Sequence, residues 1–155
     1  IMGPEKKAIL KEVWAAQKEG IIFDCAHGRM HFPFAFVQQA LDAGFLPDTI
    51  ATDLTIPSAT KGPVFDLPTT MSKLLNLGMT LEDVVQCVTT NPARVIGEHE
   101  QIGTLKPGAV ADVAVLSLEH GEFDFVDTDQ NHMIGEQKLV THLTIKDGRI
   151  WYQAD

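Results

Sequence analysis

The sequence contains no long hydrophobic run, and this absence excludes one class of protein. A membrane-spanning helix needs roughly 18 or more consecutive apolar residues, and no stretch of these 155 residues approaches that length. A hydrophobic fraction of 45% and a charged fraction of 21% are typical of a soluble globular protein. We therefore expect a chain of ordinary single-domain length that has no membrane partner.

Lysine and arginine are also scarce, and cysteine is nearly absent. The 12 basic residues are outnumbered by 21 acidic ones, which gives a net charge of −9. Surfaces that bind DNA or RNA need clustered positive charge, so nucleic acid is excluded as a partner. The two cysteines, Cys25 and Cys87, have no metal-binding or redox spacing, which favours a reducing, cytoplasmic location.

Two short apolar segments each lead into a polar side chain that is suited to chemistry. Residues 21–25 precede His27, and residues 49–52 precede Asp53. Each segment follows a helical pattern, so the two are predicted to be consecutive parallel strands of a βαβ unit. Ligands of parallel sheets bind at the carboxyl ends of the strands. His27 and Asp53 are therefore the first candidates for a functional site.

Apolar spacing and end signals predict several helices around these strands. The predicted helices span residues 5–18, 34–43, 69–77 and 80–89. Residues 55–65 contain Pro57, Gly62 and Pro63 and are predicted to form a loop. This loop leaves the end of the second strand, where binding loops commonly lie.

Beyond residue 102 the hydrophobic pattern changes from helical to alternating. Strands are predicted over residues 111–116, 139–145 and 149–152. The acidic segment 119–137 is expected to be a long loop. The sequence thus divides into an α/β part, residues 1–102, and a small β part, residues 103–155. Both parts have too few strands to close a sheet, so we expect partner strands from outside the chain.

Three further motifs resemble, in this order, the amidohydrolase superfamily. They are TNPA at residues 90–93, GTLKPGAVADVAVL at residues 103–116 and TIKDGRI at residues 144–150. The segment FDLPTTMSKLL at residues 65–75 is similar to one branch in particular, the dihydroorotase-like proteins and N-acyl-amino-acid deacetylases. The resemblance covers nearly the whole chain.

This resemblance implies an α/β fold, a (β/α)8 TIM barrel flanked by a small β-sandwich. Residues 1–102 would supply the C-terminal part of the barrel, with its last two strands and helices. Residues 103–155 would supply the C-terminal strands of the composite sandwich. The incomplete sheets are then explained, because the remaining N-terminal part of the barrel becomes the expected partner. We also expect the complete protein to form a homo-oligomer.

The resemblance also implies a metal-dependent hydrolysis. Members of the family cleave a C–N bond in an amide or cyclic imide of a small molecule. They use one or two divalent metal ions, usually zinc, that lower the pKa of a bound water. Asp53 matches the family's aspartate after the eighth strand, which is a metal ligand and the general base. Without the resemblance, the pattern around Asp53 is also that of a turn or helix-capping aspartate.

Three other side chains are candidates for substrate binding, each with a structural alternative. His27 would donate a hydrogen bond to the substrate or to a neighbouring ligand, unless its ring is satisfied by backbone in a tight turn. Pairing it with His31 on a metal would need a helix, which the glycine and proline around His31 disfavour. Arg29 and Lys61, in the loops after the two strands, would anchor a substrate carboxylate or else be solvated.

Most of the metal ligands that the family uses are missing. No His-x-His motif occurs and no lysine follows a strand, so Asp53 is the single expected ligand here. We therefore expect these 155 residues alone to bind metal weakly and not to catalyse. The alternative is a non-catalytic, dihydroorotase-like scaffold or assembly protein that has lost the metal site. Two copies could also exchange elements and complete each other's sheets.

Overall fold

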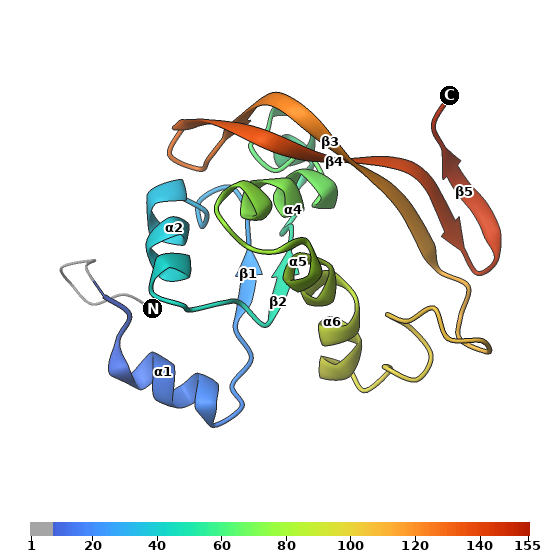
Figure 1. Ribbon diagram of the computed structural model, residues 1–155, viewed down its shortest axis with the longest axis horizontal. Helices are drawn as coiled ribbons and strands as arrows, with labels where there is room; N and C mark the ends of the chain where they lie inside the picture. Colours follow the sequence, from blue (N-terminus) through green and yellow to red (C-terminus); the bar gives the residue numbers. More distant parts are fainter. Residues whose placement is uncertain (1–7) are drawn as a thin grey trace.

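The structure is a computed structural model that describes residues 8–155. Its elements, in chain order, are α1 (Lys11–Lys18), β1 (Asp24–Ala26), α2 (Phe34–Asp42), β2 (Thr49–Ala51), α3 (Ile56–Lys61), α4 (Leu67–Asn76), α5 (Leu81–Val88), α6 (Thr90–Val95), β3 (Val113–Val126), β4 (His132–Lys146) and β5 (Arg149–Gln153). The predicted strands and the four predicted helices are present with shifted ends (Figure 1). Residues 5–7 of the first predicted helix lie outside the described residues.

The two strands that lead to the candidate site lie side by side. β1 and β2 pair in parallel, with Cys25 opposite Ile50, and form a two-stranded sheet among the described residues. The Thr49 hydroxyl donates a hydrogen bond of 2.6 Å to the Asp24 carboxylate at the start of this pairing. Helix α2 makes the connection between the strands (Figure 1). The βαβ unit predicted from the sequence is therefore confirmed.

Helices α4 and α5 begin at side chains that satisfy their free N–H groups. The Asp66 carboxylate accepts a hydrogen bond of 2.7 Å from the Thr69 backbone N–H, and Pro68 lies in the first turn of α4. The Thr80 hydroxyl accepts a hydrogen bond of 3.1 Å from the Asp83 N–H at the start of α5. Such caps stabilise a helix end by about 1 kcal/mol.

Helix α4 is at the centre of the hydrophobic core. Six consecutive residues of α4, 70–75, are buried, so the helix is enclosed on all sides rather than on one face. Its Leu74 is fully buried, as are Phe32 before α2 and Val84 of α5. The core therefore gathers around α4, and every polar side chain on this helix has to find its partners inside the protein.

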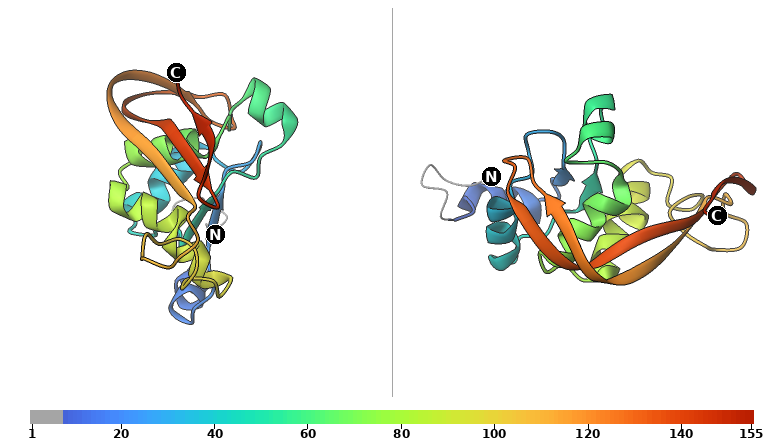
Figure 2. Two further views of the ribbon diagram at one scale, coloured as in Figure 1. Left: turned by 90° about the vertical axis from the view of Figure 1, so that its right-hand side faces the viewer. Right: turned by 90° about the horizontal axis from the view of Figure 1, so that it is seen from above.

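The long β3–β4 hairpin crosses α4 and joins the β part to the α/β part. In Figure 1 the hairpin passes over α4, and the right-hand view of Figure 2 shows α3 projecting away from it. The Leu139 N–H donates to the Ser72 hydroxyl at 2.9 Å, and Asn76 donates to the Gln137 carbonyl at 2.7 Å. Residue 135, a buried glycine, lies directly against the Asn76 side chain. Polar residues of α4 thus fix the hairpin in register.

The prediction of a loop over residues 119–137 is wrong. These residues form the distal half of the β3–β4 hairpin, with a turn between the two strands. Phe125 and Leu139 are buried on the face toward α4, whereas Glu119, Glu122 and Asp124 are exposed. The acidic composition comes from the solvent-facing side of a half-buried ribbon, and the alternation around Phe125 was the signal of a strand.

The prediction of an uninterrupted loop over residues 55–65 is also wrong. Residues Ile56–Lys61 form the short helix α3, which begins at a capping box. The Ser58 hydroxyl accepts from the Thr55 N–H at 2.9 Å, and the Thr55 hydroxyl accepts from the Ser58 N–H at 3.4 Å. Pro57 sits in the first turn, where proline is compatible with a helix.

Two other sequence-based expectations have different outcomes. Within residues 8–155, no helix has both the length and the apolar character that crossing a membrane requires. The division of the chain near residue 103 stays a prediction, although the parallel pairing precedes that position and the antiparallel sheet follows it.

Asp127 connects the hairpin to the start of α2, and its removal is the sharpest test of this packing. The buried carboxylate accepts hydrogen bonds from the N–H groups of Phe34, Asp129 and Asn131 and from the Asn131 side chain. Asp127→Ala would leave buried donors unpaired. We expect a loss of about 3 kcal/mol in the free energy of unfolding, measured by urea denaturation. Asp129→Ala, at the exposed neighbouring position, should change it little, and equal losses in both variants would contradict this role.

Candidate functional site

The segments that follow β1 and β2 remain hydrogen bonded beyond the ends of the strands. The His27 N–H donates to the Ala51 carbonyl and the Gly28 N–H donates to the Thr52 carbonyl, both at 3.0 Å. This extension carries the parallel pairing up to Asp53. The sequence-based expectation that His27 and Asp53 lie at the same edge of the sheet is therefore met.

Asp53 is exposed and has an unusual backbone conformation. Its φ angle is 47°, in the left-handed region that few residues other than glycine occupy. Such a conformation costs of order 1 kcal/mol or more and persists where surrounding contacts enforce it, often at functional sites. The strained backbone turns the Asp53 side chain toward the segment after β1, where it lies against Gly28.

Gly28 is the point at which the turn after β1 meets the segment after β2. It is buried and has a φ angle of 52°, and a Cβ atom added to it would lie 2.7 Å from Asp53 Oδ2 and 3.0 Å from His31 Nδ1. The positive φ angle favours glycine here, and a Cβ atom would also displace the Asp53 and His31 side chains. The Asp53 carboxylate and the His31 imidazole thus lie against the same residue.

Sequence reasoning did not find the position of His31. The sequence disfavours a helical, metal-binding His27–His31 pair, and the residues between the two histidines do form a turn. The turn reverses the chain, so that the exposed His31 side chain comes back to Gly28 while the His27 side chain is buried. The left-handed conformation available to Gly28 was the signal that could have predicted this reversal.

His27 is fully buried, and both of its ring nitrogens are occupied. Its ring stacks on Phe32, with centroids 4.4 Å apart and planes 7° from parallel. Because a carbonyl can only accept, Nδ1 donates to the Gly28 carbonyl at 2.8 Å, and Nε2 accepts from Lys73 Nζ at 2.8 Å. The backbone-satisfied histidine weighed as the alternative is the arrangement observed. Hydrogen bonding to a substrate stays a prediction.

Burial and a neighbouring charge keep His27 neutral. Desolvation is the larger cause and the positive Lys73 is the second, and together they lower the pKa of His27 to about 4. The neutral ring is required by the hydrogen bonds, since a protonated Nε2 could not accept from Lys73.

Lys73 is the other buried functional group, and the sequence analysis did not single it out. Its side chain is 1% exposed, and Nζ donates to His27, to the Pro63 carbonyl at 2.6 Å and to the Val126 carbonyl at 2.8 Å. Desolvation lowers the pKa of Lys73 to about 8, although Asp127 and Asp66 oppose the shift. The burial of this helix on all sides was not evident from the mixed TTMSKLLN sequence.

Arg29 and Lys61 are both exposed, as their proposed contact with substrate requires. Arg29 follows Gly28 in the turn after β1, and Lys61 is the last residue of α3. Both belong to segments that leave the carboxyl end of the sheet. Their role as anchors for a substrate carboxylate stays a prediction.

The residues present do not fit a complete metal site. Within residues 8–155 there is no group of three or more His, Cys, Asp or Glu side chains placed to hold a metal ion. Asp53 and His31 approach the same glycine, but two side chains are fewer than the three protein ligands of a catalytic zinc site. Any metal would need ligands beyond those that this part of the chain supplies.

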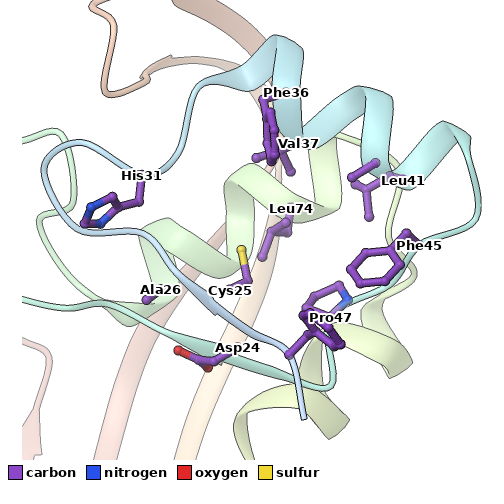
Figure 3. Close-up of a pocket in the computed structure, with 12 residues that line it drawn as sticks. Asp24, Cys25, Ala26, His31, Phe36, Val37, Leu41, Phe45, Pro47 and Leu74 are labelled. Carbon is purple, nitrogen blue, oxygen red and sulfur yellow. The ribbon is translucent and has the colours of Figure 1, made fainter. Parts of the chain in front are cut away.

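A mostly apolar cavity of about 330 Å³ lies beside β1, and Asp53 is not among the residues that line it. Figure 3 shows Cys25, Leu74 and the α2 side chains pointing into it, with His31 at one end. Burial, as the main cause, and the negative charge of Asp24, as the second, raise the pKa of the Cys25 thiol to about 12. The cavity therefore holds no reactive thiolate and is better suited to packing than to catalysis.

The close contact between Gly28 and Asp53 can be tested with alanine. Gly28→Ala combines a positive φ angle with a clash against Asp53 Oδ2, whereas Gly20→Ala meets nothing within 4 Å at a φ angle of 91°. We expect Gly20→Ala to lose about 1 kcal/mol from backbone strain alone and Gly28→Ala to lose clearly more, measured by urea unfolding. Equal losses would mean that the Asp53 carboxylate is free to move away from Gly28, which would contradict its restraint by this residue.

The low pKa of His27 predicts a dependence of stability on pH. Between pH 4 and pH 6.5 the unfolded chain binds a proton at His27 that the folded protein excludes. Stability should therefore rise with pH across this window, by at most about 3 kcal/mol, and this contribution should be constant above it. His27→Phe should remove this part of the pH dependence in thermal unfolding. An unchanged slope in the variant would contradict the assignment.

Comparison with known proteins gives the family. A sequence model described as "Amidohydrolase family" matches residues 70–152, which is more than half of the chain. A deacetylase of Enterococcus faecalis is 32% identical over 138 residues, which cover 89% of this chain and 37% of that protein. The chain thus spans well under half the length of this curated relative.

Two solved structures share the fold. The crystal structure of an adenine deaminase superimposes with a TM-score of 0.93 at 30% identity, covering 99% of this chain and 41% of the other. The crystal structure of a dihydroorotase superimposes with a TM-score of 0.80 at 31% identity, covering 92% of this chain and 37% of the other. These neighbours are amidohydrolase TIM-barrel proteins, so the predicted fold class is confirmed. The chain belongs to the amidohydrolase family.

Proposed function

We propose that this chain is the C-terminal part of a longer, metal-dependent amidohydrolase that hydrolyses a C–N bond in an amide or cyclic imide. The specific activity that we propose is that of an N-acyl-amino-acid deacetylase or of a dihydroorotase-like enzyme. The observation that carries the proposal is Asp53, which sits at the carboxyl end of β2 in a strained conformation and against Gly28. Membership of the amidohydrolase family and the partial coverage of its relatives support it.

Asp53 supplies the acid–base chemistry in this proposal. Hydrolysis of an amide needs a group that takes a proton from the attacking water and delivers it to the leaving nitrogen. An exposed carboxylate at the end of a barrel strand can reach both atoms without moving the backbone. The contact with Gly28 restricts the orientation of the carboxylate, which lowers the cost of aligning it with the substrate.

Charged groups near the same edge set the proposed substrate class. Arg29 and Lys61 carry positive charge on the segments after β1 and β2. Either can anchor the carboxylate of an N-acyl amino acid or of a related ring compound. Uncharged amides lack such a group and should be poorer substrates.

The rest of the protein completes the site in this proposal. The remaining N-terminal part of the barrel would pair with the open edge of β1, cover the cavity beside it and supply the missing ligands for one or two zinc ions. Both described cysteines are free thiols, which supports a cytoplasmic location. Assembly into a homo-oligomer also stays part of the proposal.

The first experiment measures the intact mass, the metal content and the hydrolytic activity of one sample. The intact mass of the protein purified from its natural source decides whether a chain longer than 17.0 kDa exists. Zinc analysis and a screen of N-acyl amino acids and cyclic imides then follow on the same sample. A full-length protein without metal and without hydrolysis would contradict the proposal and favour the non-catalytic scaffold.

In the full-length enzyme, Asp53→Asn should lower kcat by about a hundredfold or more, because the amide cannot accept the proton of water. The fold should be kept, as judged by circular dichroism, since the two side chains have the same shape. Asp129→Asn makes the same chemical change at an exposed turn and should leave kcat unchanged. Near-normal turnover in Asp53→Asn would remove Asp53 from the mechanism.

A further inference from the structure

We propose that Lys73 is a positioning residue for Asp53, which it orients through His27 and Gly28. The inference rests on the proposed function of Asp53. It adds a residue that is separated from Asp53 by His27 and Gly28. Lys73 itself is 1% exposed and cannot touch a substrate. Its effect must therefore pass through the residues that it contacts.

The Lys73 ammonium group is held in one orientation. Its three N–H groups donate to His27 Nε2 and to two backbone carbonyls, Pro63 after α3 and Val126 at the end of β3. A lysine ammonium has three donors, so none is left over. The group is attached to three separate parts of the fold and cannot rotate without breaking a buried hydrogen bond.

Lys73 in turn selects one tautomer and one orientation of His27. An N–H that points at Nε2 requires Nε2 to be unprotonated, so the proton of the neutral ring is on Nδ1. Nδ1 then donates to the Gly28 carbonyl at 2.8 Å. The stack on Phe32 fixes the plane of the ring, while the two hydrogen bonds fix its rotation within that plane.

The last link is the contact between Gly28 and Asp53. The Gly28 carbonyl is held by His27, and the Gly28 N–H is held by the Thr52 carbonyl. Both ends of this residue are thus restrained beside Asp53, so close that a Cβ atom built on Gly28 would lie 2.7 Å from Asp53 Oδ2. Loss of the His27 hydrogen bond would free the turn to move by a fraction of an ångström, and with it the carboxylate.

A purely structural role explains a lysine at position 73 less well than a positioning role does. Burying an ammonium group costs free energy, and an apolar side chain would fill a core position of α4 without that cost. Lysine adds directional hydrogen bonds here. They link the Val126 carbonyl of the hairpin, through His27, to the turn that carries Gly28. The position of Asp53 is thereby linked to the docking of the hairpin on α4.

The test uses the full-length enzyme and the substrate found in the screen of N-acyl amino acids and cyclic imides. Lys73→Met should lower kcat by roughly tenfold, because a displacement of about 1 Å in a catalytic group costs about a hundredfold and a smaller displacement costs less, with KM unchanged within about twofold. Lys18→Met makes the same change at an exposed position and should keep wild-type kcat. An unchanged kcat in Lys73→Met would overturn the inference.

A second variant guards against a general loss of folding in Lys73→Met. His27→Phe keeps an aromatic ring on Phe32 and leaves Lys73 in place, but removes the hydrogen bond to Gly28. It should lower kcat as Lys73→Met does. Since both residues act through one link, the double variant should lose no more than either single variant. Losses that multiply would show two independent effects and would overturn the inference.

A substrate-free measurement separates this inference from the proposed function. The carboxyl 13C signal of Asp53, identified by its absence in Asp53→Asn, reports the surroundings of the carboxylate. Its chemical shift should change in both Lys73→Met and His27→Phe and should stay the same in Lys18→Met. If the wild-type enzyme hydrolyses no C–N bond, the proposed function fails, and a moved signal still supports the positioning link. If the signal stays in place, the inference fails even in an active enzyme.

Discussion

The buried ammonium group of Lys73 is the constraint on which much of this structure depends. A positive charge removed from water must be surrounded by acceptors, and few are free in the interior of a folded protein. Here they come from the turn after β1, the segment after α3 and the end of β3. Three segments that lie far apart in the sequence must therefore converge on one helix. Helix α4 is enclosed on all sides because it carries the group that brings them together.

The same constraint separates the rigid part of the candidate site from the accessible part. His27, Lys73 and Asp127 are buried and hydrogen bonded, and no buried side-chain polar atom in the described part of the chain lacks a partner. Asp53, His31 and the loop cations remain exposed around them. Buried groups hold the backbone, and exposed groups are left free to meet a ligand. Such a division is expected where a reactive side chain needs a fixed orientation but also access to water.

Structural features set by neighbouring residues could be predicted from the sequence, whereas features set by contacts between distant residues could not. Residues 49–52 and Asp53 follow from a short apolar run that ends in a polar residue, which is visible within a few positions. The pairing of Lys73 with His27 joins residues 46 positions apart and leaves no trace in either local pattern. The hairpin was misjudged because Glu119 and Asp124 face solvent, while the burial of Phe125 depends on the position of α4. The approach of His31 to Gly28 was not predicted, because it depends on the conformation of the turn at Gly28.

The contacts that place Asp53 lie within the part of the chain described here, whereas a complete set of metal ligands does not. The position of Asp53 and the missing metal ligands are therefore supplied by different parts of the proposed enzyme. The contacts of Gly28 with Thr52, and of Lys73 with the hairpin, need no metal and no further strand. In the proposed enzyme the carboxylate would then be oriented before the site is complete. Assembly of the barrel would then bring ligands and water to a group already in place, which reduces the reorganisation that the reaction requires.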